Sequence, residues 1–146
     1  MAPIAGICER DIDLLLYEEF VASPPFLEWF VRRVDAAAAV PLSVMAVHRS
    51  RTDSTGESDL EVAYVDSNGT VARILIENKV GAGFQPRQAE RYQERKAAYL
   101  ARCEAERVTT VLVAPTSYLG SSGNTHGFEH SVTYEELRDW FAAESS

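Results

Sequence analysis

The sequence predicts an α/β fold in which helices flank a mixed central sheet of four to five strands, in the order α-α-β-β-β-α-β-β-α. Residues 58–65 and 71–80 are rich in Val, Ile, Leu and Tyr and enclose a turn around Asn68-Gly69, a pattern typical of a β-hairpin. Farther on, a long helical segment separates two apolar strands, and a crossover of that length joins parallel strands. A chain of 146 residues can bury roughly 70% of its unfolded surface around one core, so we expect residues 1–146 to form one domain.

The segments around the hairpin predict the remaining elements. Before it we expect a buried helix over 9–22 broken by Ser23-Pro24-Pro25, a helix from Phe26 to Ala38, a strand over 42–48 and a polar loop over 51–57. After it we expect a crossover over 80–84, a long helix from Pro86 to about Arg107, a buried strand over 108–114, a Gly- and Ser-rich loop over 120–127, a short extended piece over 128–132 and a last helix over 134–141. Thr133 and Glu136 have the spacing of a capping box at the start of that last helix.

The register of the hairpin decides whether three polar residues lie on one face. The Asn-Gly pair suggests a two-residue loop. That register would put the apolar side chains of the two strands on opposite faces, because a slip of one residue moves every side chain across the sheet. A three- or five-residue loop restores the match. It brings Asp59 level with Glu77 or Lys79 and sets Glu61 near Arg73.

Asp59 and Glu77 would then form a pair of carboxylates, which are ligands that magnesium prefers together with water and substrate phosphate. A metal ion there would acidify a bound water and polarise a phosphoryl oxygen. Lys79, two residues beyond Glu77 on the same face, could stabilise the charge that develops on the phosphorane. The alternative is an exposed aspartate beside a Glu–Lys ladder on the surface of a hairpin.

Two further groups of residues could contribute to such a site. Gln88 and Tyr92 stand one turn apart on the following helix, and Gln88 lies in its first turn, where an anion is favoured; alternatively they are a helix cap and a core aromatic. Glu18 and Glu19 lie in an otherwise apolar helix. Glu19 should face the interior, where a carboxylate is costly unless it is paired or metal-bound, but the helix pattern does not choose between the two.

Charge and composition restrict the class of protein. The net charge of −8 argues against a general nucleic-acid coat, yet the segment from Lys79 to Arg107 carries seven basic and four acidic residues. This basic strip could grip a phosphate backbone, or it is a solvated helix face. No apolar run approaches the length of a membrane helix, and the N-terminus lacks the features of a signal peptide. Cys8 and Cys103 have no zinc or disulfide spacing, so a cytoplasmic location is expected by default.

Taken in order, Asp59, Glu77-Asn78-Lys79 and the Gln88-x-x-x-Tyr92 spacing resemble the PD-(D/E)XK nuclease superfamily, the last of them its exonuclease-type branch. The element order from the first helix to the fourth strand is similar to that superfamily's restriction-endonuclease-like core. The resemblance implies Mg²⁺, for which Mn²⁺ may substitute, bound by Asp59 and Glu77 with Glu18 or Glu19 completing the site. It makes Lys79 a catalytic residue and Gln88 an accessory one. Ser58 departs from the pattern, since it replaces the motif's proline, a residue that supplies no ligand.

From these residues we expect a magnesium-dependent nuclease that cuts phosphodiester bonds, with DNA as its substrate and Arg87, Arg91 and Tyr92 as nucleic-acid contacts. Small members of the superfamily act in DNA repair, phage defence and mobile elements. The alternative is a catalytically inactive nuclease fold that binds nucleic acid or a partner protein. No specificity domain is evident, so a homodimer or a partner protein could help to hold the substrate.

Overall fold

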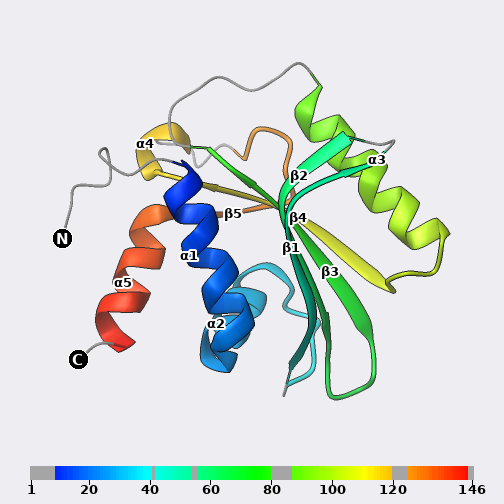
Figure 1. Cartoon of the computed structure of the whole chain (residues 1–146), viewed down its shortest axis with the longest axis horizontal. Coiled ribbons are helices and arrows are strands. Elements are labelled where there is room, and N and C mark those ends of the chain that lie inside the picture. Colours follow the sequence, from blue (N-terminus) through cyan, green and yellow to red (C-terminus); the bar gives the residue numbers. More distant parts are fainter. Residues whose placement is uncertain (1–8, 41, 54–55, 80–86, 120–124, 145–146) are drawn as a thin grey trace.

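A five-stranded mixed sheet forms the centre of the molecule, with its strands in the order β1-β2-β3-β4-β5 (Figure 1). The strands are β1 (Ser43–Asp53), β2 (Gly56–Val65), β3 (Val71–Asn78), β4 (Arg107–Ala114) and β5 (His130–Thr133). The helices are α1 (Glu9–Ala22), α2 (Pro24–Val34), α3 (Gln88–Ala101), α4 (Thr116–Leu119) and α5 (Tyr134–Glu144). This computed structural model describes residues 9–40, 42–53, 56–79, 87–119 and 125–144. The predicted crossover over 80–84 and Pro86 lie outside these residues.

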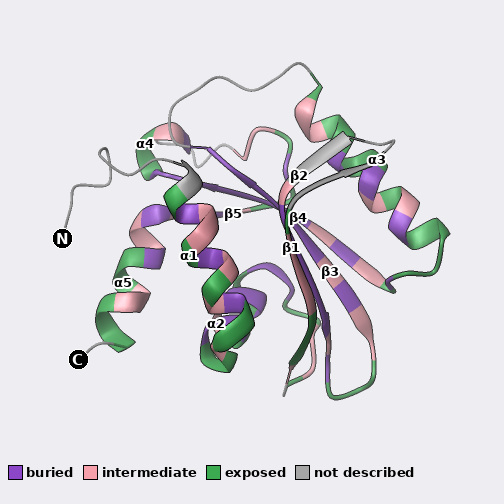
Figure 2. Cartoon of the chain, in the orientation of Figure 1, coloured by how far each residue is buried: buried purple, intermediate pink, exposed green. Residues whose placement is uncertain are grey.

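Helices cover both faces of the sheet and enclose two apolar cores. α1, α2 and α5 lie on one face and α3 lies on the other (Figure 1), and the buried residues follow the sheet between them (Figure 2). β1 to β3 form an antiparallel meander, whereas β3 and β4 are parallel and joined through α3. The predicted α/β class with a mixed, helix-flanked sheet is therefore confirmed. None of the helices within the described part of the chain is long and apolar enough to cross a membrane.

The hairpin adopts the five-residue loop that apolar matching allows. Val65 pairs with Val71 and Leu60 pairs with Ile76, so residues 66–70 form the loop. The Asp66 carboxylate accepts hydrogen bonds from the N–H groups of Asn68 and Thr70, both at 3.0 Å. The Asn-Gly pair therefore does not set the loop length, because Asp66 organises a wider turn around it.

Several predicted helix and strand boundaries in the N-terminal half of the chain are wrong. The two prolines begin α2 instead of only breaking α1, because Pro is well suited to the first positions of a helix. The Ser23 hydroxyl caps α2 by accepting from the Phe26 N–H at 3.3 Å, and the helix ends at Val34, not at Ala38. β1 and β2 extend into the loop predicted over 51–57, where Asp53 pairs with Gly56.

α3 ends six residues before the predicted boundary near Arg107. Cys103 adopts a left-handed conformation with φ of 58°. The Cys103 N–H donates to the Leu100 carbonyl and the Glu104 N–H to the Tyr99 carbonyl, the two hydrogen bonds of a Schellman motif. The predicted cap of the last helix is confirmed, since the Glu136 N–H donates to the Thr133 hydroxyl at 3.0 Å.

Candidate active site

The candidate site lies where the antiparallel ladder between β2 and β3 ends. The last paired residues are Leu60 and Ile76. Two residues beyond Ile76, the Asn78 N–H donates at 2.9 Å to Oδ2 of Asp59, a side chain, instead of to the backbone of β2. The separation of the two strands therefore places the Asp59 carboxylate beside the segment that carries Glu77.

Tyr92 reaches this opening from α3. The Asp59 N–H donates to the Tyr92 hydroxyl at 3.3 Å, and the hydroxyl lies 2.8 Å from Glu77 Oε1 and 3.1 Å from the Ile76 carbonyl oxygen. Burial, followed by the negative charges of Glu77 and Asp59, raises the pKa of Tyr92 well above its ordinary value. The phenol therefore stays protonated and acts as a donor to the Glu77 carboxylate.

The buried position of Tyr92 corrects one expected role. Its residue surface is 1% exposed and its ring packs edge-on against Phe128 with centroids 5.0 Å apart. The ring is thus a core aromatic with a polar tip, and it is not offered to a nucleic acid for stacking. What Tyr92 contributes here is a hydrogen bond to the site.

Lys79 completes the cluster. Its Nζ lies 3.6 Å from Glu77 Oε2, and both side chains are almost fully buried. The Lys79 N–H donates to the Val113 carbonyl at 2.9 Å, which keeps the end of β3 attached to β4. The Tyr92 hydroxyl therefore contacts Asp59 and Glu77, and Glu77 in turn contacts Lys79.

A buried polar cluster fastens α3 over this face of the sheet. Glu61 is 0% exposed and accepts from Arg95 Nε at 2.5 Å and from the Tyr99 hydroxyl. Arg73 lies 3.8 Å from the same carboxylate, as the register predicts, and its guanidinium lies over the Tyr99 ring at 4.3 Å. Because Arg95 is buried, it does not belong to the basic strip that the sequence suggests.

The remaining expected metal ligands are not brought together. Glu18 is exposed and Glu19 half-buried on α1, and no three His, Cys, Asp or Glu side chains in the described ranges are arranged to hold an ion. Two carboxylates nevertheless suit Mg²⁺, which keeps several waters and is commonly bound through one or two carboxylates plus substrate phosphate. Asp59 and Glu77 fit that donor set. Metal binding by them stays a prediction.

The side chains expected to touch nucleic acid or assist the site lie at the start of α3. Gln88 is its first residue and is half-buried. Arg87 and Arg91 are exposed. Arg87 pairs with Glu90 at 2.7 Å and with Glu94 at 3.5 Å, and its hydrogen bond to Glu90 raises its pKa. Part of the expected positive charge is therefore balanced on the helix itself.

The sequence reasoning missed the partners of Asn78. Its side chain is 0% exposed on the α1 face of the sheet, where Nδ2 donates to Asp13 Oδ1 at 3.1 Å and Oδ1 accepts from the Tyr134 hydroxyl. The signal was present in part, because Asn78 continues the apolar series of Ile74 and Ile76 as a polar residue. Nothing in the local pattern indicates which helices would meet it.

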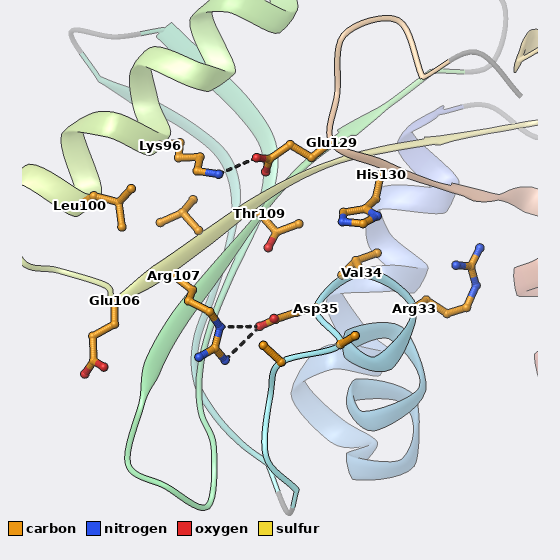
Figure 3. A pocket seen from close by; sticks show the side chains of 13 residues that line it. Arg33, Val34, Asp35, Lys96, Leu100, Glu106, Arg107, Thr109, Glu129 and His130 are labelled. Atoms are coloured by element: carbon orange, nitrogen blue, oxygen red, sulfur yellow. Dashed lines mark hydrogen bonds and ion pairs between the residues drawn. The ribbon is translucent and has the colours of Figure 1, made fainter.

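A separate hollow of about 570 Å³ lies at the far end of the sheet, along the first residues of β4 (Figure 3). Four of its charged side chains form two ion pairs: Arg107 pairs with Asp35 at 3.1 Å, and Lys96 pairs with Glu129 at 2.5 Å. β4 places the two ends well apart, since Arg107 lies level with Ala72 and Val113 lies level with Asn78. The hollow is therefore distinct from the cluster around Tyr92.

Comparison with known proteins adds no relative. No family model, no curated protein and no solved structure matches this chain.

Proposed function

We propose that this chain is a metal-dependent nuclease that hydrolyses phosphodiester bonds of DNA on a restriction-endonuclease-like core. The observation that carries the proposal is a chain of contacts at the end of two adjacent strands: the Tyr92 hydroxyl contacts Asp59 and Glu77, and Glu77 contacts Lys79. Two acids that could hold a metal ion and one ammonium beside them are groups that can promote phosphodiester hydrolysis. Roles in DNA repair, phage defence or mobile-element biology would all suit such an activity.

Each residue of the candidate site would have a separate role in the reaction. A magnesium ion held by Asp59 and Glu77 would supply an acidified water and polarise the phosphoryl oxygen. Lys79 would stabilise the negative charge that develops on the phosphorane, and its burial strengthens that interaction. Tyr92, kept protonated, would orient the Glu77 carboxylate through Oε1, whereas Lys79 lies next to Oε2.

Cleavage of plasmid and linear DNA with Mg²⁺ or Mn²⁺ tests the proposal. We expect Lys79→Met to reduce the cleavage rate by about 10²–10³-fold, the usual cost of losing one group that stabilises transition-state charge. Lys96→Met is the matched control, because it removes from α3 an ammonium that pairs with Glu129. It should keep the wild-type rate. Equal rates for both variants and the wild type would indicate a contaminating nuclease and defeat the proposal.

A second candidate function is a catalytically inactive module that binds nucleic acid or a partner protein. One observation favours it: each oxygen of Glu77 already has a protein partner, Tyr92 at Oε1 and Lys79 at Oε2. Titration calorimetry with Mn²⁺ in the presence of DNA separates the two functions. The nuclease should bind Mn²⁺ and lose it in Asp59→Asn, whereas the inactive module should bind DNA and no metal.

A further inference from the structure

Asn78 is a buried amide at a position where the sheet otherwise presents apolar side chains. Ile74 and Ile76 precede it on the same face of β3 and pack in the core beneath α1, α2 and α5. An aliphatic residue would continue that column without the desolvation cost of an amide. A polar side chain retained there needs a reason beyond packing.

The hydrogen bonds of Asn78 connect four elements. A carboxylate can only accept, so the Nδ2 group faces Asp13 of α1, at 3.1 Å, and Oδ1 is left to accept from the Tyr134 hydroxyl of α5. Both ends of the amide are thereby fixed. The backbone N–H of the same residue lies in the plane of the sheet, points toward β2 and donates at 2.9 Å to Asp59 Oδ2.

We infer that Asn78 is a positioning residue, which Asp13 and Tyr134 hold so that its backbone N–H fixes the Asp59 carboxylate beside Glu77. The effect of Asn78 on metal binding rests on the proposed function, since a misplaced Asp59 would weaken the metal site. The orientation it describes is a property of the protein without metal. It can therefore be measured whether or not the protein is a nuclease.

The test compares two tyrosine variants that each lose one buried hydrogen bond. Tyr134→Phe removes the hydroxyl that holds Asn78. Tyr64→Phe removes a buried hydroxyl that donates to Asp35 at 2.5 Å, at the other end of the sheet. Both tyrosines lie in the same apolar core, and because the acceptor of Tyr64 is a carboxylate, Tyr64→Phe should lower global stability at least as much as Tyr134→Phe.

The first readout is amide hydrogen exchange in metal-free protein. We expect the Asn78 amide to exchange about tenfold faster in Tyr134→Phe than in Tyr64→Phe, which corresponds to the loss of roughly one hydrogen bond. The Lys79 amide, which donates to Val113 in the same segment, serves as the internal reference and should not differ between the variants. Asp13→Ala, which removes the other partner of Asn78, should reproduce the effect if Tyr134→Phe fails to fold.

The second readout is Mn²⁺ affinity, which we expect to fall about 10-fold or more in Tyr134→Phe and to stay unchanged in Tyr64→Phe, as for other groups that orient metal ligands. Equal exchange of the Asn78 amide in the two variants would overturn the inference. Faster exchange in Tyr134→Phe together with no Mn²⁺ binding by the wild type would support the positioning role and refute the nuclease. Failure of the positioning role and failure of the proposed nuclease function therefore give different results.

Discussion

At the scale of single residues, the candidate site is organised by one buried hydroxyl. Tyr92 receives the N–H of Asp59 and lies within hydrogen-bond distance of Glu77, so it links the two carboxylate-bearing strands at the place where their ladder opens. Its raised pKa keeps the proton on the phenol, which makes the contact to Glu77 a hydrogen bond to a charged group. Such bonds are stronger than those between neutral groups.

Replacing that hydroxyl should separate its structural effect from its effect on the site. We expect Tyr92→Phe to lower the free energy of unfolding by about 1–2 kcal/mol, because a buried hydrogen bond to a charged acceptor is lost while the ring stays in place. Tyr99→Phe is the matched control, since Tyr99 lies on the same helix and donates to the buried Glu61. Urea unfolding should show similar losses in both variants.

The DNA cleavage rate should then distinguish the two. With Tyr92→Phe we expect a drop of about tenfold, equivalent to roughly 1.4 kcal/mol at the transition state, because Glu77 loses an orienting donor. The Tyr99→Phe rate should remain close to that of the wild type. A drop of the same size in both variants would mean that Tyr92 acts only through the stability of α3.

At the scale of elements, the β2–β3 turn depends on Asp66. Besides Asn68 and Thr70, its carboxylate accepts the Ala39 N–H at 3.1 Å, and it lies 3.5 Å from an Arg107 nitrogen. The hydrogen bond from Ala39 is the largest of the effects that lower the pKa of Asp66 in the folded protein. The turn is therefore stabilised by the charged form of one residue.

This dependence sets the direction of a pH effect. Because the folded pKa of Asp66 is below the unfolded value of about 4, its contribution to stability is present above that pH and is lost as the pH falls through the folded pKa. We expect Asp66→Asn to be less stable than the wild type at pH 7 and the difference to shrink on acidification. Urea unfolding at several pH values measures it, with the exposed Asp139→Asn as a control for charge. A difference that stayed constant down to pH 2 would contradict the expectation.

The end of α3 gives a second prediction at this scale. Cys103 holds a positive φ that costs an L-residue about 1–2 kcal/mol and costs glycine little. Cys103→Gly should therefore raise the free energy of unfolding by about 1 kcal/mol. Ala97→Gly, at an exposed position in the interior of α3, should lower it by roughly 0.5–1 kcal/mol. Denaturant unfolding checks both, and a destabilised Cys103→Gly would show that its side chain makes contacts that outweigh the strain.

These elements also show which features the sequence could predict. Burial of one apolar face excluded the two-residue turn, so the convergence of Asp59 with Glu77 followed from Leu60 lying level with Ile76. The end of α3 did not follow, because a cysteine in the left-handed position resembles any other helical residue. The contacts of Asn78 did not follow either, since they depend on how α1 and α5 pack.

At the scale of the whole molecule, the two faces of the sheet contribute differently to the candidate site. The α3 face supplies Tyr92 and the buried cluster around Glu61, whereas the opposite face supplies the partners of Asn78. The site thus depends on both cores at once. The net charge of the chain is −8, so it attracts cations over its whole surface. This general attraction must be separated from specific binding at the candidate site.

A thermal shift with Mn²⁺ makes that separation. A ligand that binds only the folded state at a hundredfold excess over its dissociation constant stabilises it by about 2.7 kcal/mol, which for a chain of this size raises Tm by about 5–10 °C. We expect this shift in the wild type and in Asp139→Asn, an exposed change on α5 that lowers the net negative charge by the same amount as Asp59→Asn. Asp59→Asn, whose side-chain oxygen can still accept from the Asn78 N–H, should lose the shift. Equal Tm shifts in the two variants would mean that Mn²⁺ stabilises the protein through its overall charge and not by binding the carboxylates at the end of β2 and β3.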